Sequence, residues 1–186
     1  MKALMTTCAI CVLGALISLP VPAVEVTFRP VVDGVYAYIG ETDGRTYENE
    51  GLNANIGLVV TPEGAVLIDS GATFQSAHKI QEAVKRVTSQ PVRWVINTGG
   101  QDHRWLGNGY FRAQGAEIMA HANAESDMKA RAGGHLEALK VLKERLDGTI
   151  PTLPNRFVQG NDTRLALGGV VIELKYRGGG HTPGDM

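Results

Sequence analysis

Runs of apolar residues in the first third of the chain predict three β-strands. Residues 31–39 alternate between apolar and polar side chains, as a half-buried strand does. Residues 55–61 and 65–69 are rich in β-branched and other apolar residues, and the turn tripeptide Pro62-Glu63-Gly64 separates them. This arrangement predicts a hairpin. The polar, glycine-containing stretch 40–51 between the first strand and the hairpin is expected to be a loop.

The remaining two thirds of the chain predict helices that alternate with strands. Apolar residues recur at helical spacing over 74–87, with charged residues on the opposite face, so this segment is expected to be an amphipathic helix. The nearly continuous apolar run 92–96 is typical of a strand that helices cover on both faces. The expected elements after it are a helix at 105–114, a strand at 117–120, a long helix at 123–146 that is bent or interrupted near Gly133-Gly134, and a hairpin of strands 163–167 and 170–176.

This order of elements predicts a single layered α/β domain. The chain has 186 residues, which is enough for one domain with a substantial core. Its formal net charge of −1 gives no basic excess with which to neutralise phosphates, so we expect no nucleic-acid partner. A small molecule is the expected ligand, and composition does not bear on the oligomeric state.

The N-terminus predicts export. Lys2 precedes an apolar run from Ala3 to Leu19, and Pro20, Pro22 and Ala23 follow it, as in a secretory signal peptide that is cleaved near Ala23. We therefore expect a signal peptide at 1–23, a domain at 24–186, a periplasmic or secreted location and no stable membrane insertion after cleavage. A single membrane anchor is the competing interpretation, because the run approaches the length of a short spanning helix.

Both cysteines, Cys8 and Cys11, lie inside that N-terminal segment. The mature chain would therefore have neither a disulfide nor a thiolate ligand or nucleophile, and any metal would be held by His, Asp or Glu.

Two loops carry candidate metal-site residues. Asp102 and His103 follow the strand at 92–96 through a glycine loop, and His181 lies in Gly178-Gly179-Gly180-His181-Thr182-Pro183-Gly184-Asp185. Imidazole and carboxylate groups at strand ends suit a hydrolytic zinc site, in which the metal activates a bound water. The alternatives are an exposed loop pair or a helix-capping Asp at 102–103, and an incidental histidine at 181.

Together these loops resemble the metallo-β-lactamase superfamily of zinc hydrolases, in which a His-x-His-x-Asp-His loop and a later Gly-His-Thr-x-Gly-Asp loop converge on one metal centre. The resemblance covers roughly residues 32–185. It implies the N-terminal portion of an αββα sandwich and a truncated or partial chain, because the sequence stops one residue after the second motif. The two first histidine positions of the earlier motif fall on Thr98 and Gly100, which are poor zinc ligands.

The resemblance also implies roles for individual residues. Asp102, His103 and His181 would be metal ligands, and Asp102 could instead orient and deprotonate the attacking water. Asp69 and Asp185 would support the ligand loops from behind, although Asp69 also fits a turn or helix-cap residue. His78 and His135, on expected helices, are predicted to be solvated, and we expect His121 to be a locally hydrogen-bonded strand-end histidine.

Two functional hypotheses follow. In the first, the protein is an exported hydrolase with one zinc ion, whose activated water attacks an ester, thioester or lactam-like bond. In the second, the protein is a non-catalytic, metal-free binding or structural relative that kept the fold and lost the zinc site. The polar loops at 41–53 and 148–161 would set substrate choice in the first case.

Overall fold

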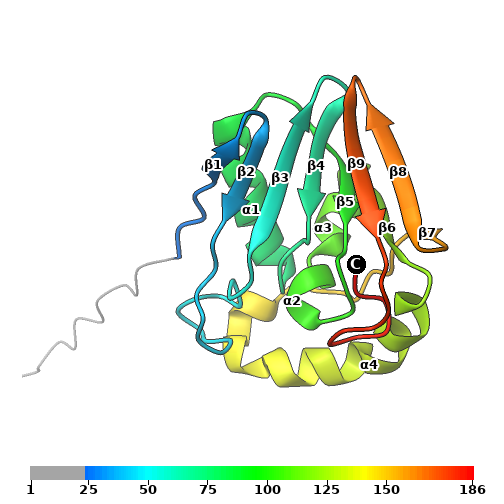
Figure 1. Cartoon of the computed structure of the whole chain (residues 1–186). Helices are drawn as coiled ribbons and strands as arrows, with labels where there is room; N and C mark the ends of the chain where they lie inside the picture. The colour runs from blue at the N-terminus through cyan, green and yellow to red at the C-terminus, as the bar shows by residue number, and fades with distance from the viewer. Residues whose placement is uncertain (1–23) are drawn as a thin grey trace, which may run out of the picture.

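The computed structural model describes residues 24–186 and consists of two β-sheets with helices (Figure 1). The larger sheet has seven strands in chain order: β1 Arg29–Val32, β2 Val35–Tyr38, β3 Ile56–Thr61, β4 Gly64–Ile68, β5 Val92–Ile96, β6 Glu117–His121 and β7 Arg156–Val158. Strands β1 to β4 pair antiparallel, and β4 to β7 pair parallel. The smaller sheet is the antiparallel hairpin of β8 Asp162–Leu167 and β9 Val170–Lys175.

Five helical segments complete the described chain: α1 Phe74–Val87, α2 Asp102–Trp105, α3 Asn108–Ala113, α4 Ala124–Ala138 and the 3₁₀ segment η1 Leu139–Leu146. Helix α1 begins and ends where the sequence predicts. Its N-cap Thr73 accepts a hydrogen bond from the backbone N–H of Ser76, whose hydroxyl in turn accepts from the backbone N–H of Thr73. Strand β5 and both hairpins also lie where they were predicted.

Four predictions of secondary structure were wrong. The segment 31–39 is not one strand, since Gly34, with a φ of 71°, turns the chain between β1 and β2. The expected helix at 105–114 is two short helices, and β7 occupies part of the segment expected to be a loop. Helix α4 runs through Gly133 and Gly134 without a break, and the non-helical residue is Lys143, with a φ of 50°.

Three apolar clusters hold the layers together. The first lies between the large sheet and helices α1 and α3, where Leu67, Ile80 and Phe111 are fully buried. The second surrounds Trp105 and joins α2 to α4 and η1. The third lies between the large sheet and the β8–β9 hairpin, which covers the face opposite α1 and α3 in Figure 1. The layers therefore follow the order helices, large sheet, small sheet.

The architecture brings the candidate loops to one edge of the large sheet. Because β4, β5 and β6 are parallel, the residues that follow them, Asp69, Asn97 and Ala122, lie at the same end of the sheet. The C-terminal segment returns to this edge after β9, and the backbone N–H of Met186 donates to the carbonyl of Thr98 at 2.9 Å.

Among residues 24–186, no helix is long and apolar enough to cross a membrane. The predicted signal peptide at 1–23 lies outside the described residues.

Candidate functional site

Asp69 holds the loop that follows β5. It adopts a φ of 66°, which is unusual for a residue with a side chain, and it is only 6% exposed. One carboxylate oxygen accepts from the backbone N–H of Thr98 and the other from its hydroxyl, both at 2.7 Å. Burial raises the pKa of Asp69 to about 7, although the two hydrogen bonds from Thr98 and the nearby Arg104 act against this rise. The Asp69 side chain thus holds the start of the loop at Thr98.

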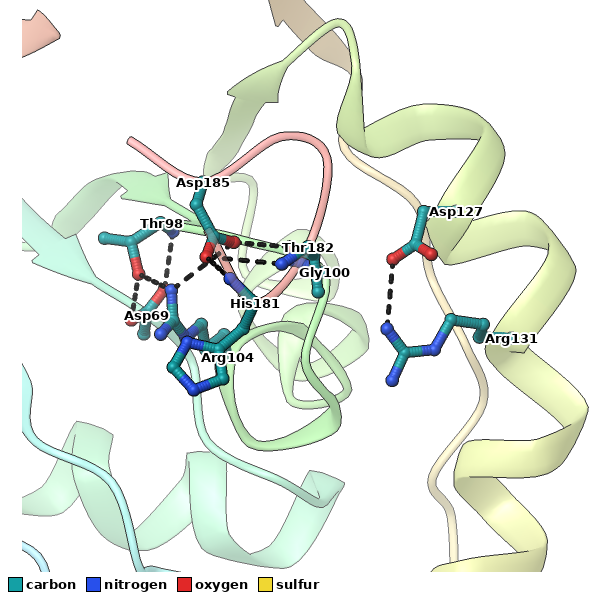
Figure 2. Close-up of polar contacts among 9 residues, drawn as sticks. All are labelled: Asp69, Thr98, Gly100, Arg104, Asp127, Arg131, His181, Thr182 and Asp185. Carbon is teal, nitrogen blue, oxygen red and sulfur yellow. Dashed lines mark hydrogen bonds and ion pairs between the residues drawn. The ribbon is translucent and has the colours of Figure 1, made fainter. Parts of the chain in front are cut away.

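Arg104 connects this loop to the C-terminal loop. Figure 2 shows its guanidinium between Thr98 and Asp185. Its Nη1 donates to the hydroxyl of Thr98 at 3.1 Å and lies 3.8 Å from an oxygen of Asp185. The Arg104 guanidinium therefore lies beside Thr98, which stands at the first histidine position of the motif, and near the carboxylates of Asp69 and Asp185.

The C-terminal loop is held by Asp185. Its Oδ2 accepts from the backbone N–H groups of His181 at 2.8 Å and of Thr182 at 3.3 Å, and its Oδ1 accepts from the Thr182 hydroxyl. That same hydroxyl accepts from the backbone N–H of Gly100 at 2.8 Å. The two motif loops, more than 80 positions apart in the chain, are therefore joined directly (Figure 2).

The glycines of the first loop are tightly surrounded. A Cβ atom at Gly99 would overlap a carboxylate oxygen of Asp185, and one at Gly100 would lie 2.6 Å from Oδ2 of Asp127 on α4. A side chain at Gly99 would require the Asp185 carboxylate, which three hydrogen bonds hold in place, to move. A side chain at Gly100, the second histidine position of the motif, would require Asp127 to move, which is feasible because Asp127 presents the end of a flexible side chain.

Asp102 and His103 are bound by an arginine that the sequence analysis did not select. Arg45, in the loop between β2 and β3, donates through Nη2 to Asp102, and the same nitrogen lies 2.7 Å from Nδ1 of His103. The His103 backbone N–H donates to Asp102 at 2.8 Å. Burial raises the pKa of Asp102, but the hydrogen bonds from His103 and Arg45 outweigh that effect and hold the pKa below its ordinary value. Asp102 is therefore a paired carboxylate.

The sequence carries no local pattern that indicates a contact between Arg45 and Asp102. It lies in a polar loop with other charged residues, 57 positions before Asp102, and only the folded chain brings them together.

The residues present do not fit a zinc centre as the structure arranges them. A catalytic zinc site needs about three protein ligands, and within residues 24–186 no three His, Cys, Asp or Glu side chains are grouped to hold a metal ion. Thr98 uses its hydroxyl on Asp69, and Gly100 has no side chain. His181 is exposed. A divalent cation at Asp102 and His103 would also meet the charge of Arg45.

The other histidines divide into three cases. His78 is exposed on α1, as predicted. His121 is buried and locally bonded, also as predicted: its Nδ1 accepts from the Asn123 backbone N–H, and its Nε2 lies 3.2 Å from the Gly160 carbonyl. The prediction for His135 was wrong, because this side chain is 8% exposed and packs against Trp105 with ring centroids 6.1 Å apart.

Comparisons with known proteins agree with this fold. The family model described as the metallo-beta-lactamase superfamily matches residues 49–186. A metallo-beta-lactamase from Pontibacter korlensis superposes with a TM-score of 0.61 at 21% identity, covering 87% of this chain and 65% of that one. The DIM-1 metallo-beta-lactamase gives a TM-score of 0.65 at 15% identity, covering 88% and 64%. A double mutant of the sec-alkyl sulfatase PisA1 gives 0.64 at 17%, covering 86% and 28%. The chain thus spans less than two thirds of the length of these proteins.

Proposed function

From its membership of the metallo-β-lactamase superfamily, whose members are generally metal-dependent hydrolases, and from its candidate site, we propose that this chain is a relative in which a small-molecule binding site has replaced the zinc centre. The observation that carries the proposal is the placement of Arg45, whose guanidinium contacts both Asp102 and His103. These are two of the three residues predicted to be metal ligands, and an arginine of the chain already contacts both.

The charges around the loops support the same proposal. Asp102 has Arg45 as its partner, and Asp185 has Arg104 nearby. A zinc ion at Asp102 would have to displace the Arg45 guanidinium, so its attraction to Asp102 would be offset in part by the loss of the existing ion pair. With Thr98 and Gly100 at the first two histidine positions, few ligands remain to compensate.

The hydrolase hypothesis is the alternative outcome. It requires Arg45 to withdraw and His181 to join Asp102 and His103 around one zinc ion, which would activate water to attack an ester, thioester or lactam-like bond.

Zinc content decides between the two. The purified chain is incubated with a small excess of zinc, dialysed and analysed by elemental mass spectrometry, alongside His103→Ala, His181→Ala and the control His78→Ala. We expect well below one zinc per chain in all four proteins, and a melting temperature that does not change with chelator. About one zinc per chain that is lost in the first two variants and kept in the control would overturn the proposal.

We also propose export to the periplasm, which rests on the apolar run from Ala3 to Leu19. The full chain is expressed in a Gram-negative host, fractionated, and its N-terminus sequenced. A periplasmic product that begins near Val24 is expected, and an uncleaved product in the membrane fraction would favour an anchor instead.

A further inference from the structure

A pocket lies between the first motif loop and helix α4, next to the Asp102–Arg45 pair. Its volume is about 240 Å³. The pocket is lined by Arg45, Gln101, Asp102, Arg131, His135 and Ala138. The side chains come from three separate parts of the chain: the β2–β3 loop, the start of α2 and the middle of α4.

The histidine that lines this pocket has unmet hydrogen-bonding capacity. His135 is 8% exposed, and neither Nδ1 nor Nε2 has a hydrogen-bond partner among residues 24–186. His121, which is 4% exposed, has a partner within the chain for both nitrogens. Because buried polar groups in folded proteins are almost always paired, the difference between these two histidines indicates that His135 is placed to contact something outside the chain.

Two neighbouring buried groups share this property. Nε of Arg45, whose Nη2 binds Asp102, has no partner among the described residues, and neither has Nε1 of Trp105, whose ring packs against His135. Leaving a buried donor unpaired costs about 1–3 kcal/mol. Of these groups, Arg45 and His135 line the pocket, and Trp105 packs against His135. The unpaired nitrogens of Arg45 and His135 therefore favour a bound polar ligand over chance packing.

The chemistry of the lining favours an oxyanion. Arg45 offers an N–H, Gln101 an amide, and His135 a ring N–H. The one carboxylate in the lining, Asp102, is already paired with Arg45. Arg131 donates through Nη1 to Asp127 at 3.3 Å (Figure 2), and its side chain is 45% exposed. Its other N–H groups are available to a ligand in the pocket that it lines. A carboxylate accepts several such bonds at once and pairs with guanidinium in a two-pronged geometry.

The size of the pocket limits the ligand. Pockets for drug-sized molecules are about 300–1,000 Å³, so this one is small. We propose that the pocket between the Gln101–Asp102 turn and α4 binds a small carboxylate of a few carbon atoms, with His135, Arg45 and Arg131 as its main contacts. This inference rests on the proposed function, because it requires Arg45 and Asp102 to stay paired and metal-free.

The test uses succinate as the probe and the ¹⁵N resonances of the histidine rings as the readout. We expect the His135 resonances to shift saturably, with a dissociation constant of about 1 mM or tighter, while those of His78 do not shift. Arg131→Gln should weaken binding at least about fivefold, because it removes a cation from the pocket rim. The matched control is Arg156→Gln, since Arg156 is 46% exposed and pairs with Glu117 at 3.1 Å, much as Arg131 pairs with Asp127. This control should bind succinate as the unmodified chain does.

The outcomes separate this inference from the proposed function. An absence of saturable shifts at His135, or equal weakening in both arginine variants, would overturn the carboxylate site even if the chain is metal-free. Tight zinc binding at His103 and His181 would overturn the proposed function, whatever succinate does. Since neither arginine belongs to a core cluster, both variants should fold, and circular dichroism checks this.

Discussion

Asp69→Asn tests whether burial of the Asp69 carboxyl group under the first motif loop makes the stability of the chain depend on pH. The substitution keeps the shape of the side chain and one acceptor for the Thr98 backbone N–H, but removes the titrating group. In the folded chain the Asp69 pKa is about 7, against an ordinary value of 3.8, and burial is the main cause. The charged groups that face it are Arg104, which lowers the pKa, and Asp185, which raises it.

The sign and size of the effect follow from linkage. Because the folded pKa lies above the unfolded one, the folded state holds a proton that the unfolded state has released between pH 3.8 and about 7. The contribution of Asp69 to stability is therefore full below pH 3.8 and is lost as the pH rises through 7. At 1.36 kcal/mol for each pH unit, the free energy of unfolding of the unmodified chain should fall by about 4 kcal/mol relative to Asp69→Asn across this window.

The assay is urea unfolding of both proteins, followed by circular dichroism at several pH values from about 4 to 8, so that the other titrating groups cancel in the difference. The control is Asp162→Asn. Asp162 is exposed, and the hydrogen bond from Arg177 lowers its pKa, so its effect has the opposite sign and should be small. A difference between Asp69→Asn and the unmodified chain that does not change with pH would refute the reasoning.

Two further predictions concern the Arg45–Asp102 pair and two glycines, Gly107 and Gly133. Arg45→Ala removes the guanidinium that pairs with the buried Asp102 and should lower the free energy of unfolding by about 2 kcal/mol, less than for a fully buried pair because the Arg45 side chain is 30% exposed. In urea unfolding, adding Asp102→Asn to Arg45→Ala should recover part of this loss. An unchanged unfolding midpoint in Arg45→Ala would contradict the stabilising role of the Arg45–Asp102 pair. Gly107→Ala should destabilise by about 3 kcal/mol, because its Cβ would overlap the backbone carbonyl of Ser70, whereas Gly133→Ala on α4, whose Cβ meets nothing within 4 Å, should stabilise by about 0.5–1 kcal/mol. The melting temperature should fall in Gly107→Ala and rise in Gly133→Ala relative to the unmodified chain. A change of the same sign in both variants would count against the packing argument.

Local patterns in the sequence were enough to predict the elements whose apolar residues follow one clear helical or strand pattern. Helix α1 combines an apolar face, a capping threonine and basic residues in its last turn, and all of these point to the same boundaries. Strand β5 needed only its apolar run. The break expected at Gly133-Gly134 was wrong because both glycines are exposed on α4, where glycine costs only about 1 kcal/mol each and packing of the opposite face keeps the helix intact.

The candidate site depended on contacts that no local pattern carries. The motif residues Asp102, His103 and His181 could be selected from their loops, but not the partners that they would find. Arg45 reaches Asp102 only because the β2–β3 loop folds back over α2. His135 was expected to be solvated because its sequence neighbours are polar, yet it is buried because Trp105, from a distant helix, packs against it.

The arginines explain how this chain keeps the carboxylates of the motif in place with so few metal ligands. Asp69, Asp102 and Asp185 lie in loops at one edge of the sheet, where carboxylates with no cation would repel one another and remain poorly solvated. In a zinc hydrolase the metal supplies the positive charge, and imidazoles hold the metal. Here Arg45 contacts Asp102, and Arg104 lies beside Asp185 and lowers the pKa of Asp69. The loops can therefore keep their shape without a metal. Arg45 lines the pocket and has an Nε with no partner among residues 24–186, so it is suited to binding an anion. On the proposed function, the arginines beside these loops would take the place of a metal and would also favour the anion site proposed above.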